Sequence, residues 1–206
     1  MMSLIQFRYE EILHRLKRTQ PVLSPPHDRK PAAVALILRQ GITGLELFFI
    51  QRSHHPDDPW SGNIAFPGGG VEPQDLSLQH TAERETMEEV GIDLTSALFL
   101  GRLSDIVGHN LPVRVSCFVY GLQETPVPVL SSEIREAFWV TFEHLTAAEH
   151  QIIQPVSFEG RTFKVPAIHL HPAKPVLWGI TYRLVNQFRY LLVSDTIPPG
   201  EYDLPR

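Results

Sequence analysis

The stretch that decides the fold, Gly68–Ile92, reads GGGVEPQDLSLQHTAERETMEEVGI. It begins with consecutive glycines, continues through an acidic connector, and ends in a segment typical of a helix. Ser77 or Asp75 can cap the start of this helix, and Gly91 stands where helices commonly end in the left-handed conformation. We therefore expect a glycine turn followed by a helix that ends near Gly91.

Several glutamates gather on this predicted helix. Glu85, Glu88 and Glu89 stand at positions i, i+3 and i+4, which brings their side chains towards one face. Like charges so placed repel each other, and a hard divalent cation between the carboxylates reverses the sign of that interaction. A solvated acidic face is the alternative explanation. The preceding glycines, and an adjacent Arg84 able to hold a carboxylate by a bidentate contact, favour a metal site.

At these residues the sequence resembles the Nudix hydrolase family. The family signature is a Gly, five residues, a Glu, seven residues, and then Arg-Glu-aliphatic-any-Glu-Glu-any-Gly-aliphatic. Its second half is matched by Arg84, Glu85, Glu88, Glu89, Gly91 and Ile92, with Thr86 where an aliphatic residue is usual. The first half departs from the pattern, because counting from Gly70 lands on Leu76, whereas counting from Gly69 lands on Asp75 with one extra residue before Arg84. This offset resembles the coenzyme A pyrophosphatase branch of the family.

A second stretch, RSHHPDDPWSGNIAFP at Arg52–Pro67, also resembles that branch. The branch signature is Arg-Ser, an Arg five residues after the Ser, a Gly four further on, and Phe-Pro-Gly-Gly. It is matched by Arg52, Ser53, Gly62, Phe66, Pro67, Gly68 and Gly69. Asp58 stands where the branch has its arginine, and His54 stands where a small residue is usual. The matching residues support the branch, while the two departures weaken the case for its named substrate.

The resemblance implies an α/β fold, a Nudix-type α/β/α sandwich with a mixed sheet between helices. It also implies Mg²⁺ or Mn²⁺ as cofactor, with Glu85 and Glu89 as direct ligands and a glycine-turn carbonyl, at Gly69, completing the coordination. In this interpretation Glu88 binds a metal or activates water, and Arg84 orients the cluster.

Further candidate residues lie around this centre. We expect Asp75 to steady Arg84 and not to act as a primary ligand. Glu133 or Glu136 can approach the metals from the opposite wall, with an exposed loop glutamate as the alternative for each. Two residues are substrate-binding candidates, each with a structural alternative. Arg52 can hold a phosphate or pair with a neighbouring acid, and Trp60 can stack on a base or anchor its loop.

Length, composition and charge limit the classes of function that the chain can have. With 206 residues and 43% hydrophobic content, the chain can bury one sizeable core. We expect an N-terminal helix and proline-rich linker over residues 1–31 and a Nudix domain, including a C-terminal helix, over 32–206. Cys117 is the single cysteine and lies in an apolar run, so we expect a buried, inert thiol. A net charge of -5 gives no argument for nucleic acid, and no apolar run or signal-peptide pattern suggests a membrane. We expect a cytoplasmic enzyme, with a homodimer as one option for its assembly.

Hydrophobic periodicity predicts the remaining elements. We expect helices over 4–16, 143–150 and 176–193, strands over 32–38, 45–52, 64–66, 98–103 and 113–122, and a hairpin over 156–165. We expect the histidines to be mostly structural or at the surface, with His169 and His171 on one strand face.

The expected reaction is hydrolysis of the diphosphate in a nucleoside diphosphate linked to another group. The partner is a small-molecule nucleotide, with coenzyme A or an acyl derivative as the leading candidate. ADP-ribose and NADH are alternatives, as is a non-catalytic domain that senses a nucleotide. A Nudix-fold isomerase is disfavoured because its cysteine-bearing site has no evident counterpart in this sequence.

Overall fold

A mixed sheet forms the centre of the computed structural model, which describes residues 8–25, 29–55, 60–108, 112–158 and 160–194. The first strand, β1 (Lys30–Gln40), pairs antiparallel with β2 (Leu45–Arg52) and parallel with β7 (Val113–Gly121). The path through the sheet is β3-β2-β1-β7-β5, with β4 on β1, β6 on β7 and β8 on β2. The predicted hairpin of β1 and β2 is confirmed, and so is the predicted strand at β7.

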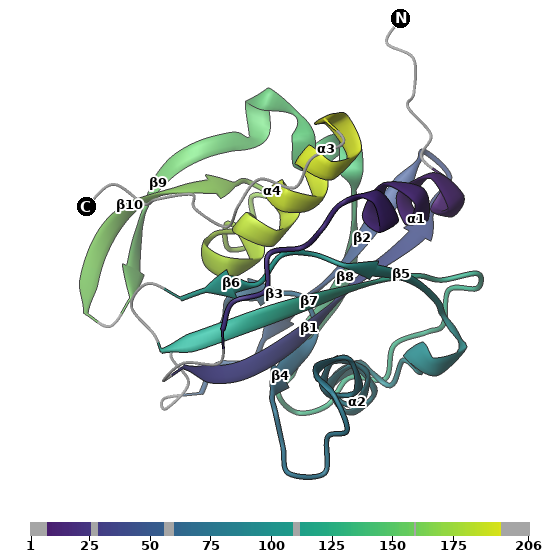
Figure 1. Ribbon diagram of the computed structural model, residues 1–206. Helices are drawn as coiled ribbons and strands as arrows, with labels where there is room; N and C mark the ends of the chain where they lie inside the picture. The colour runs from purple at the N-terminus through teal and green to yellow at the C-terminus, as the bar shows by residue number, and fades with distance from the viewer. Residues whose placement is uncertain (1–7, 26–28, 56–59, 109–111, 159, 195–206) are drawn as a thin grey trace, which may run out of the picture.

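Helices cover both faces of the sheet (Figure 1). Helix α2 (Leu78–Val90) lies against one face, while α1 (Tyr9–Arg18) and α4 (Gly179–Ser194) lie against the other. Side chains alternate along β1 accordingly, so that Leu36 belongs to the core under α1 and α4 and Ile37 to the core under α2. The expected α/β sandwich with a mixed sheet is therefore confirmed.

Shorter elements complete the fold. They are β3 (Ile64–Ala65), β4 (Gly68–Gly70), β5 (Leu98–Arg102), β6 (Ile106–Val107), β8 (Ile134–Thr141), α3 (Phe142–Thr146), β9 (Gln151–Phe158), β10 (Arg161–Ile168) and 3-10 turns at Leu94–Ser96 and Ala148–His150. Strands β9 and β10 form a separate antiparallel hairpin that is longer than the predicted 156–165. The predicted helix over 143–150 is divided between α3 and the second 3-10 turn.

The amino-terminal helix is part of the main core. Its residues Ile12 and Leu16 are buried in the same cluster as α4, and the hydroxyl of Tyr9 donates to the carbonyl oxygens of Leu38 and Leu122 at 3.0 and 2.8 Å. The predicted helix began at residue 4, and residues 4–7 lie outside the described ranges. Cys117 is buried as expected, and burial raises the pKa of its thiol above the ordinary range.

Two predictions near the carboxyl-terminal helix were wrong. The helix begins at Gly179, not at residue 176. Gly179 has a φ of 67°, in the left-handed region, so the regular helix does not extend to the residues before it. Leu177, predicted on the helix, instead exchanges backbone hydrogen bonds with Ile168, at 2.8 and 2.9 Å. His169 and His171 lie beyond the end of β10 and share no strand face.

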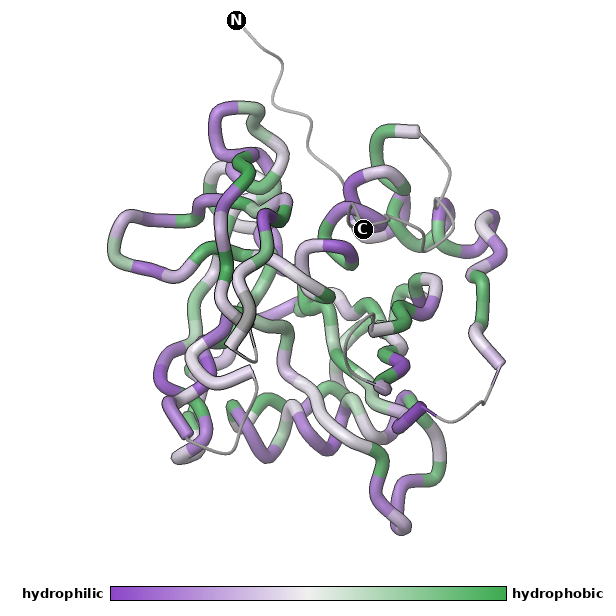
Figure 2. The backbone as a smooth tube through the Cα atoms, turned by 90° about the vertical axis from the view of Figure 1, so that its left-hand side faces the viewer, coloured by the Kyte–Doolittle hydropathy of each residue, from purple (hydrophilic) through white to green (hydrophobic). Residues whose placement is uncertain are grey.

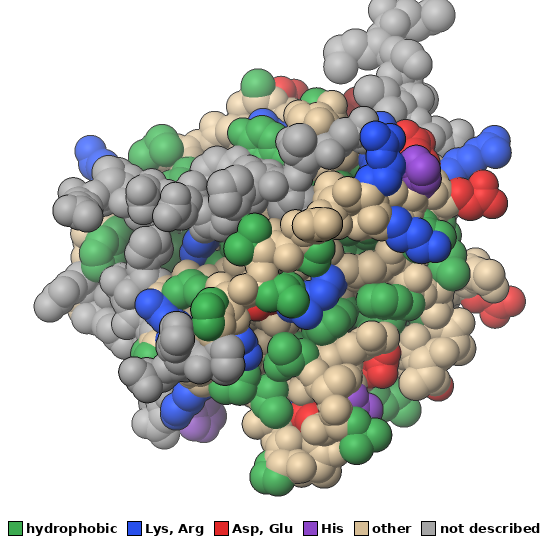
Figure 3. Space-filling model, in the orientation of Figure 1, with side chains coloured by type: hydrophobic (Ala, Val, Ile, Leu, Met, Phe, Trp, Pro, Cys, Tyr) green, Lys and Arg blue, Asp and Glu red, His purple; other side chains and the backbone are tan. Residues whose placement is uncertain are grey.

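The surface carries side chains of every type. In Figure 3, the described basic, acidic and hydrophobic side chains are interspersed over the visible face. None of the helices in the described ranges combines the length and the apolar character that crossing a bilayer requires.

Candidate active site

The glycine turn is held against the middle of the sheet. Strand β4 pairs antiparallel with β1, in the register Ala32 with Gly70, Ala33 with Gly69 and Val34 with Gly68. This pairing places bare backbone, without side chains, beside the helix that follows.

Helix α2 has the predicted ends. The Ser77 hydroxyl accepts a hydrogen bond from the backbone N–H of His80 at 3.0 Å, and Gly91 closes the helix at a φ of 66°. Hydrophilic and hydrophobic residues alternate along this helix, which crosses the lower part of the view in Figure 2. Ala82 and Val90 are buried against the sheet, and Glu89 is buried on the same side of the helix, whereas Glu88 lies on the exposed side.

Glu89 is the most enclosed acid of the cluster. Only 5% of its side chain is exposed, and its carboxylate accepts hydrogen bonds from the N–H of Gly68 at 2.9 Å and from Arg52 at 3.2 Å. Burial raises the pKa of Glu89 to about 7, and the negative charges of Glu85 and Glu133 act in the same direction. A cation beside this carboxylate would favour its ionised form.

Glu85 lies directly over the glycine turn. A Cβ atom at Gly69 would stand 2.5 Å from the carboxylate carbon of Glu85, so the absence of a side chain is what allows this approach. Burial raises the pKa of Glu85, while its ion pair with Arg84 at 2.9 Å acts in the opposite direction. The turn thus forms a cradle for one carboxylate and brings backbone and acid oxygens together.

This close approach predicts the effect of a single methyl group. Gly69→Ala should displace the Glu85 carboxylate and lower kcat/KM about tenfold to a hundredfold, because small misplacements of a reacting group are costly. The free energy of unfolding should change little, since the end of a flexible side chain can move aside. Gly70→Ala is the matched control, because no atom lies within 4 Å of its added Cβ. Equal activity losses in the two variants would contradict this role for Gly69.

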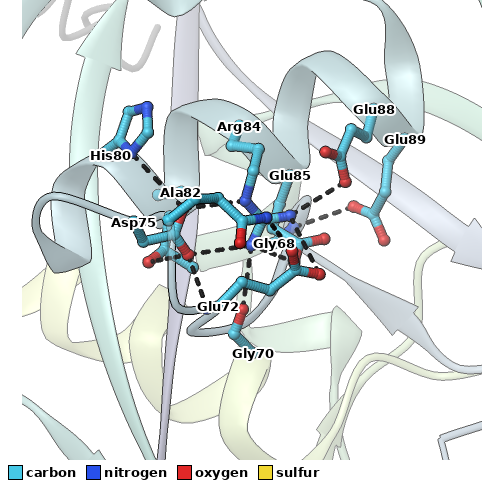
Figure 4. A network of polar contacts seen from close by, with 12 residues as sticks. Gly68, Gly70, Glu72, Asp75, His80, Ala82, Arg84, Glu85, Glu88 and Glu89 are labelled. Atoms are coloured by element: carbon cyan, nitrogen blue, oxygen red, sulfur yellow. Dashed lines mark hydrogen bonds and ion pairs between the residues drawn. The ribbon is translucent and has the colours of Figure 1, made fainter.

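Arg84 joins the acidic residues into one network (Figure 4). It binds both carboxylate oxygens of Asp75, Nε to Oδ1 at 2.9 Å and Nη2 to Oδ2 at 3.1 Å. The Asp75 side chain is inaccessible, and this arginine holds the pKa of its carboxyl well below the ordinary range. Thr81 adds a hydrogen bond to the same carboxylate at 2.9 Å. The expected pairing of Asp75 with Arg84 is therefore present.

Glu88 is the open member of the cluster. Its side chain is 58% exposed and pairs with Nη1 of Arg84 at 3.0 Å. In the part of the chain that the structure describes, no set of three Asp, Glu, His or Cys side chains is grouped as metal ligands are. Arg84 holds Glu85 and Glu88, whereas Arg52 holds Glu89. The donor chemistry, carboxylate oxygens beside bare glycine backbone, nevertheless suits Mg²⁺ or Mn²⁺.

The two acids proposed for the opposite wall differ in position. Glu133 lies near the cluster, with its carboxylate 3.8 Å from Nη2 of Arg52 and 70% of its side chain exposed. Glu136 instead pairs with Lys174 at 2.6 Å. The structure thus brings Glu133 to the site, while Glu136 is engaged elsewhere.

A cavity of about 470 Å³ adjoins the glycine turn on the side of the sheet that carries α4. Its walls come from β1, β7, the segment before the turn and the first residues of α4. Among the lining residues are Lys30, Ala32, Val34, Arg52, Trp60, Asn63, Gly68, Gly69, Gly70, Val113, Val115, Trp178, Ile180, Arg183 and Leu184. Both predicted substrate-binding candidates, Arg52 and Trp60, line it.

Three lining residues were not predicted as site residues, namely Lys30, Trp178 and Arg183. Lys30 starts a strand, and the other two lie at the start of a helix, so no local motif marks them. The fold brings them together, and a hydrogen bond from Trp178 Nε1 to Asn63 Oδ1, at 3.3 Å, ties the helix start to the segment before the glycine turn.

Comparison with known proteins identifies the family. A family model described as the NUDIX domain matches residues 28–158, more than half of the chain. The chain therefore belongs to the Nudix family. The sequence motif, the mixed sheet between helices and the position of the acidic helix all agree with this assignment.

Relatives and solved structures show how far the likeness extends. A probable nudix hydrolase of Schizosaccharomyces pombe is 25% identical over 187 residues, covering 90% of this chain and 64% of its own, so the chain spans less than two thirds of that relative. The mitochondrial coenzyme A diphosphatase of Mus musculus is 29% identical over 181 residues, covering 84% of this chain and 81% of its own. The NUDIX domain of Shewanella oneidensis NrtR, complexed with ADP ribose, aligns with a TM-score of 0.55 at 15% identity, covering 82% of this chain and 94% of that one. This last likeness concerns the fold alone.

Proposed function

We propose that this protein is a metal-dependent pyrophosphohydrolase that cleaves the diphosphate of a nucleoside diphosphate linked to another group. The observation that carries the proposal is the placing of Glu85 and Glu89 against the glycine turn, whose residues also line a cavity of about 470 Å³. Cleavage adds water across the P–O–P bridge and releases two phosphate monoesters.

Each residue of the cluster has a distinct part in this proposal. Glu85 and Glu89, with a carbonyl at Gly69, hold Mg²⁺ or Mn²⁺. When bound, the cation neutralises the diphosphate and lowers the pKa of water. Glu88, the exposed acid, binds a further cation or accepts a proton from the attacking water. Arg84, fixed by its bidentate contact to Asp75, keeps the neighbouring carboxylates in place.

The remaining candidates act on the substrate side. Arg52 stands between the cluster and the cavity, so it can orient Glu89 and contact a phosphate oxygen. Glu133, paired weakly with Arg52, is a second candidate for the acid or base. Trp60 and Trp178 supply flat apolar walls of the kind on which a nucleobase packs. The cavity volume lies within the range usual for small-molecule sites.

Coenzyme A or an acyl derivative is the leading candidate substrate. Two observations favour it, namely the matches from Arg52 to Gly69 and the activity in the name of the mouse relative. Asp58, the residue that departs from the branch signature, lies outside the described residues. ADP-ribose and NADH are the alternatives. A cytoplasmic location and a homodimer stay predictions.

A hydrolysis screen tests the proposal. Purified protein is incubated with coenzyme A, ADP-ribose, NADH, dinucleoside polyphosphates and nucleoside triphosphates, each with Mg²⁺, with Mn²⁺ and with EDTA. We expect metal-dependent release of paired phosphate monoesters from at least one diphosphate-linked compound. Tight binding of a nucleotide without cleavage would favour the alternative of a nucleotide-sensing domain.

A further inference from the structure

The cavity is lined by basic side chains, although the protein as a whole carries a net negative charge. The chain carries a net charge of -5, yet the charged side chains among the described residues that line the cavity are Lys30, Arg52 and Arg183, all of them basic. An enclosed space with one sign of charge concentrates ligands of the opposite sign. The cavity is therefore built for an anionic ligand.

These cations divide between two ends of the cavity. Arg52 faces the acidic cluster, where it pairs with Glu89 at 3.2 Å. Arg183 lies at the other end, where its Nη1 donates to the carbonyl oxygen of Val107 at 2.8 Å. Only 9% of Arg183 is exposed, so its guanidinium is held at a fixed position by the surrounding structure.

Lys30 and Arg183 meet at the same end. Lys30 pairs with Val113 in the register of β1 and β7. Gly108 follows Val107, whose carbonyl oxygen accepts from Arg183. The N–H of Gly108 donates to the carbonyl oxygen of Val113 at 2.9 Å. Two basic residues from opposite ends of the chain thus converge where β7 begins.

The spacing along β1 sets the distance from the cleavage site. Lys30, Ala32 and Val34 alternate along the strand and all line the cavity, and Ala32 pairs with Gly70 of the turn. At about 3.3 Å per residue, the Cα of Lys30 lies about 7 Å beyond that pair. This distance suits a second phosphate carried on the sugar of a nucleotide whose diphosphate lies at the glycine turn.

We propose that Lys30 and Arg183 form a subsite for an additional phosphomonoester of the substrate, separate from the diphosphate that is cleaved. The inference rests on the proposed function, which places the diphosphate of the substrate at the glycine turn. It names the substrate class as diphosphate-linked nucleotides that bear a further phosphate on the ribose. Arg183 supplies a fixed, planar set of donors, and Lys30 supplies a mobile charge at the rim.

Binding of product-like nucleotides tests this subsite without requiring turnover. The dissociation constants of adenosine 3′,5′-bisphosphate, adenosine 2′,5′-bisphosphate and 5′-AMP are measured by calorimetry for the wild type and for Lys30→Gln. We expect at least one bisphosphate to bind about tenfold more tightly than 5′-AMP, and Lys30→Gln to remove most of that preference. Comparison of the 2′ and 3′ compounds shows which ribose position faces the subsite.

Further variants distinguish an effect of the Lys30 charge from an effect on the structure. Lys30→Arg should retain the preference, because it keeps the charge. Lys164→Gln, an exposed lysine on β10 outside the cavity lining, should leave every constant unchanged. Because Lys30 is exposed, its substitution is not expected to unfold the protein. The preference of the wild type should also weaken as salt is raised, since part of the attraction is screened.

The outcomes distinguish the subsite from the proposed function. Equal binding of all three nucleotides to the wild type would overturn the subsite, and so would an equal loss for 5′-AMP and the bisphosphates in Lys30→Gln. Selective binding without metal-dependent cleavage of any diphosphate would support the subsite and overturn the hydrolase proposal. Cleavage of coenzyme A and its analogue lacking the 3′-phosphate with equal kcat/KM, together with equal binding, would leave the hydrolase intact and overturn the subsite.

Discussion

Glu89→Gln should lower kcat about a thousandfold and leave the protein folded. The substitution keeps the shape of the side chain and removes the charge that holds the cation, whose stabilisation of the transition state is worth several kcal/mol, here about 4 kcal/mol. The folded state should not suffer, because burial already disfavours the ionised form of Glu89, whose pKa is raised to about 7. Steady-state kinetics at saturating Mg²⁺ or Mn²⁺ measure the loss.

Thermal unfolding supplies a second readout for Glu89. Mg²⁺ or Mn²⁺ should raise the Tm of the wild type, because a ligand that binds only the folded state stabilises it, and this rise should be absent in Glu89→Gln. The matched control is Glu136→Gln, which removes a carboxylate engaged with Lys174 away from the cluster. Near-normal turnover by Glu89→Gln at saturating metal would remove Glu89 from the site.

Arg84→Met should be strongly destabilising, by about 3 kcal/mol in the free energy of unfolding. The substitution leaves the inaccessible Asp75 carboxylate without its bidentate partner, and breaking a partly buried ion pair from one side is costly. Denaturant unfolding at neutral pH measures the effect. The deficit should narrow as the pH falls through the acid range. The lowered pKa of Asp75 means that its stabilising contribution is present above the unfolded-state pKa and is lost on protonation.

A double-mutant cycle isolates this pair. Asp75→Asn combined with Arg84→Met should be less destabilising than the sum of the single changes, because no unpaired charge is left behind. Asp75→Asn alone should lower kcat far less than Glu89→Gln does, since Asp75 acts through Arg84. Strict additivity in the cycle would show that the contact contributes little. Equal kinetic losses in Asp75→Asn and Glu89→Gln, at equal stability, would place Asp75 among the metal ligands.

Local chemistry explains what the sequence could predict. Ser77 and Gly91 determine the ends of α2 through the conformations and hydrogen bonds of single residues, and these can be read without knowledge of the fold. The period of apolar residues likewise indicated the central strands. The motif around Arg84 and Glu85 then supplied the family, and with it the mixed sheet.

Contacts between distant segments explain what the sequence could not predict. Glu89 and Arg52 are 37 positions apart, and their pairing depends on the register between the glycine turn and the sheet. The cavity is less predictable still, because Lys30 and Arg183 come together only when β1 and α4 pack around β7. The start of α4 was misplaced because Leu177 fits the helical period but pairs with Ile168.

Product analysis in isotopically labelled water tests the central claim most directly. The protein is incubated in H₂¹⁸O with coenzyme A or the best substrate of the screen. Parallel reactions contain Mg²⁺, Mn²⁺ or EDTA, and the masses of the products are measured by mass spectrometry. The proposed hydrolysis predicts two phosphate monoesters, one of which carries a single ¹⁸O atom from the attacking water. Their formation should require the cation and should fall about a thousandfold in Glu89→Gln. Cleavage that persists in EDTA, or that proceeds in Glu89→Gln at the wild-type rate, would contradict it.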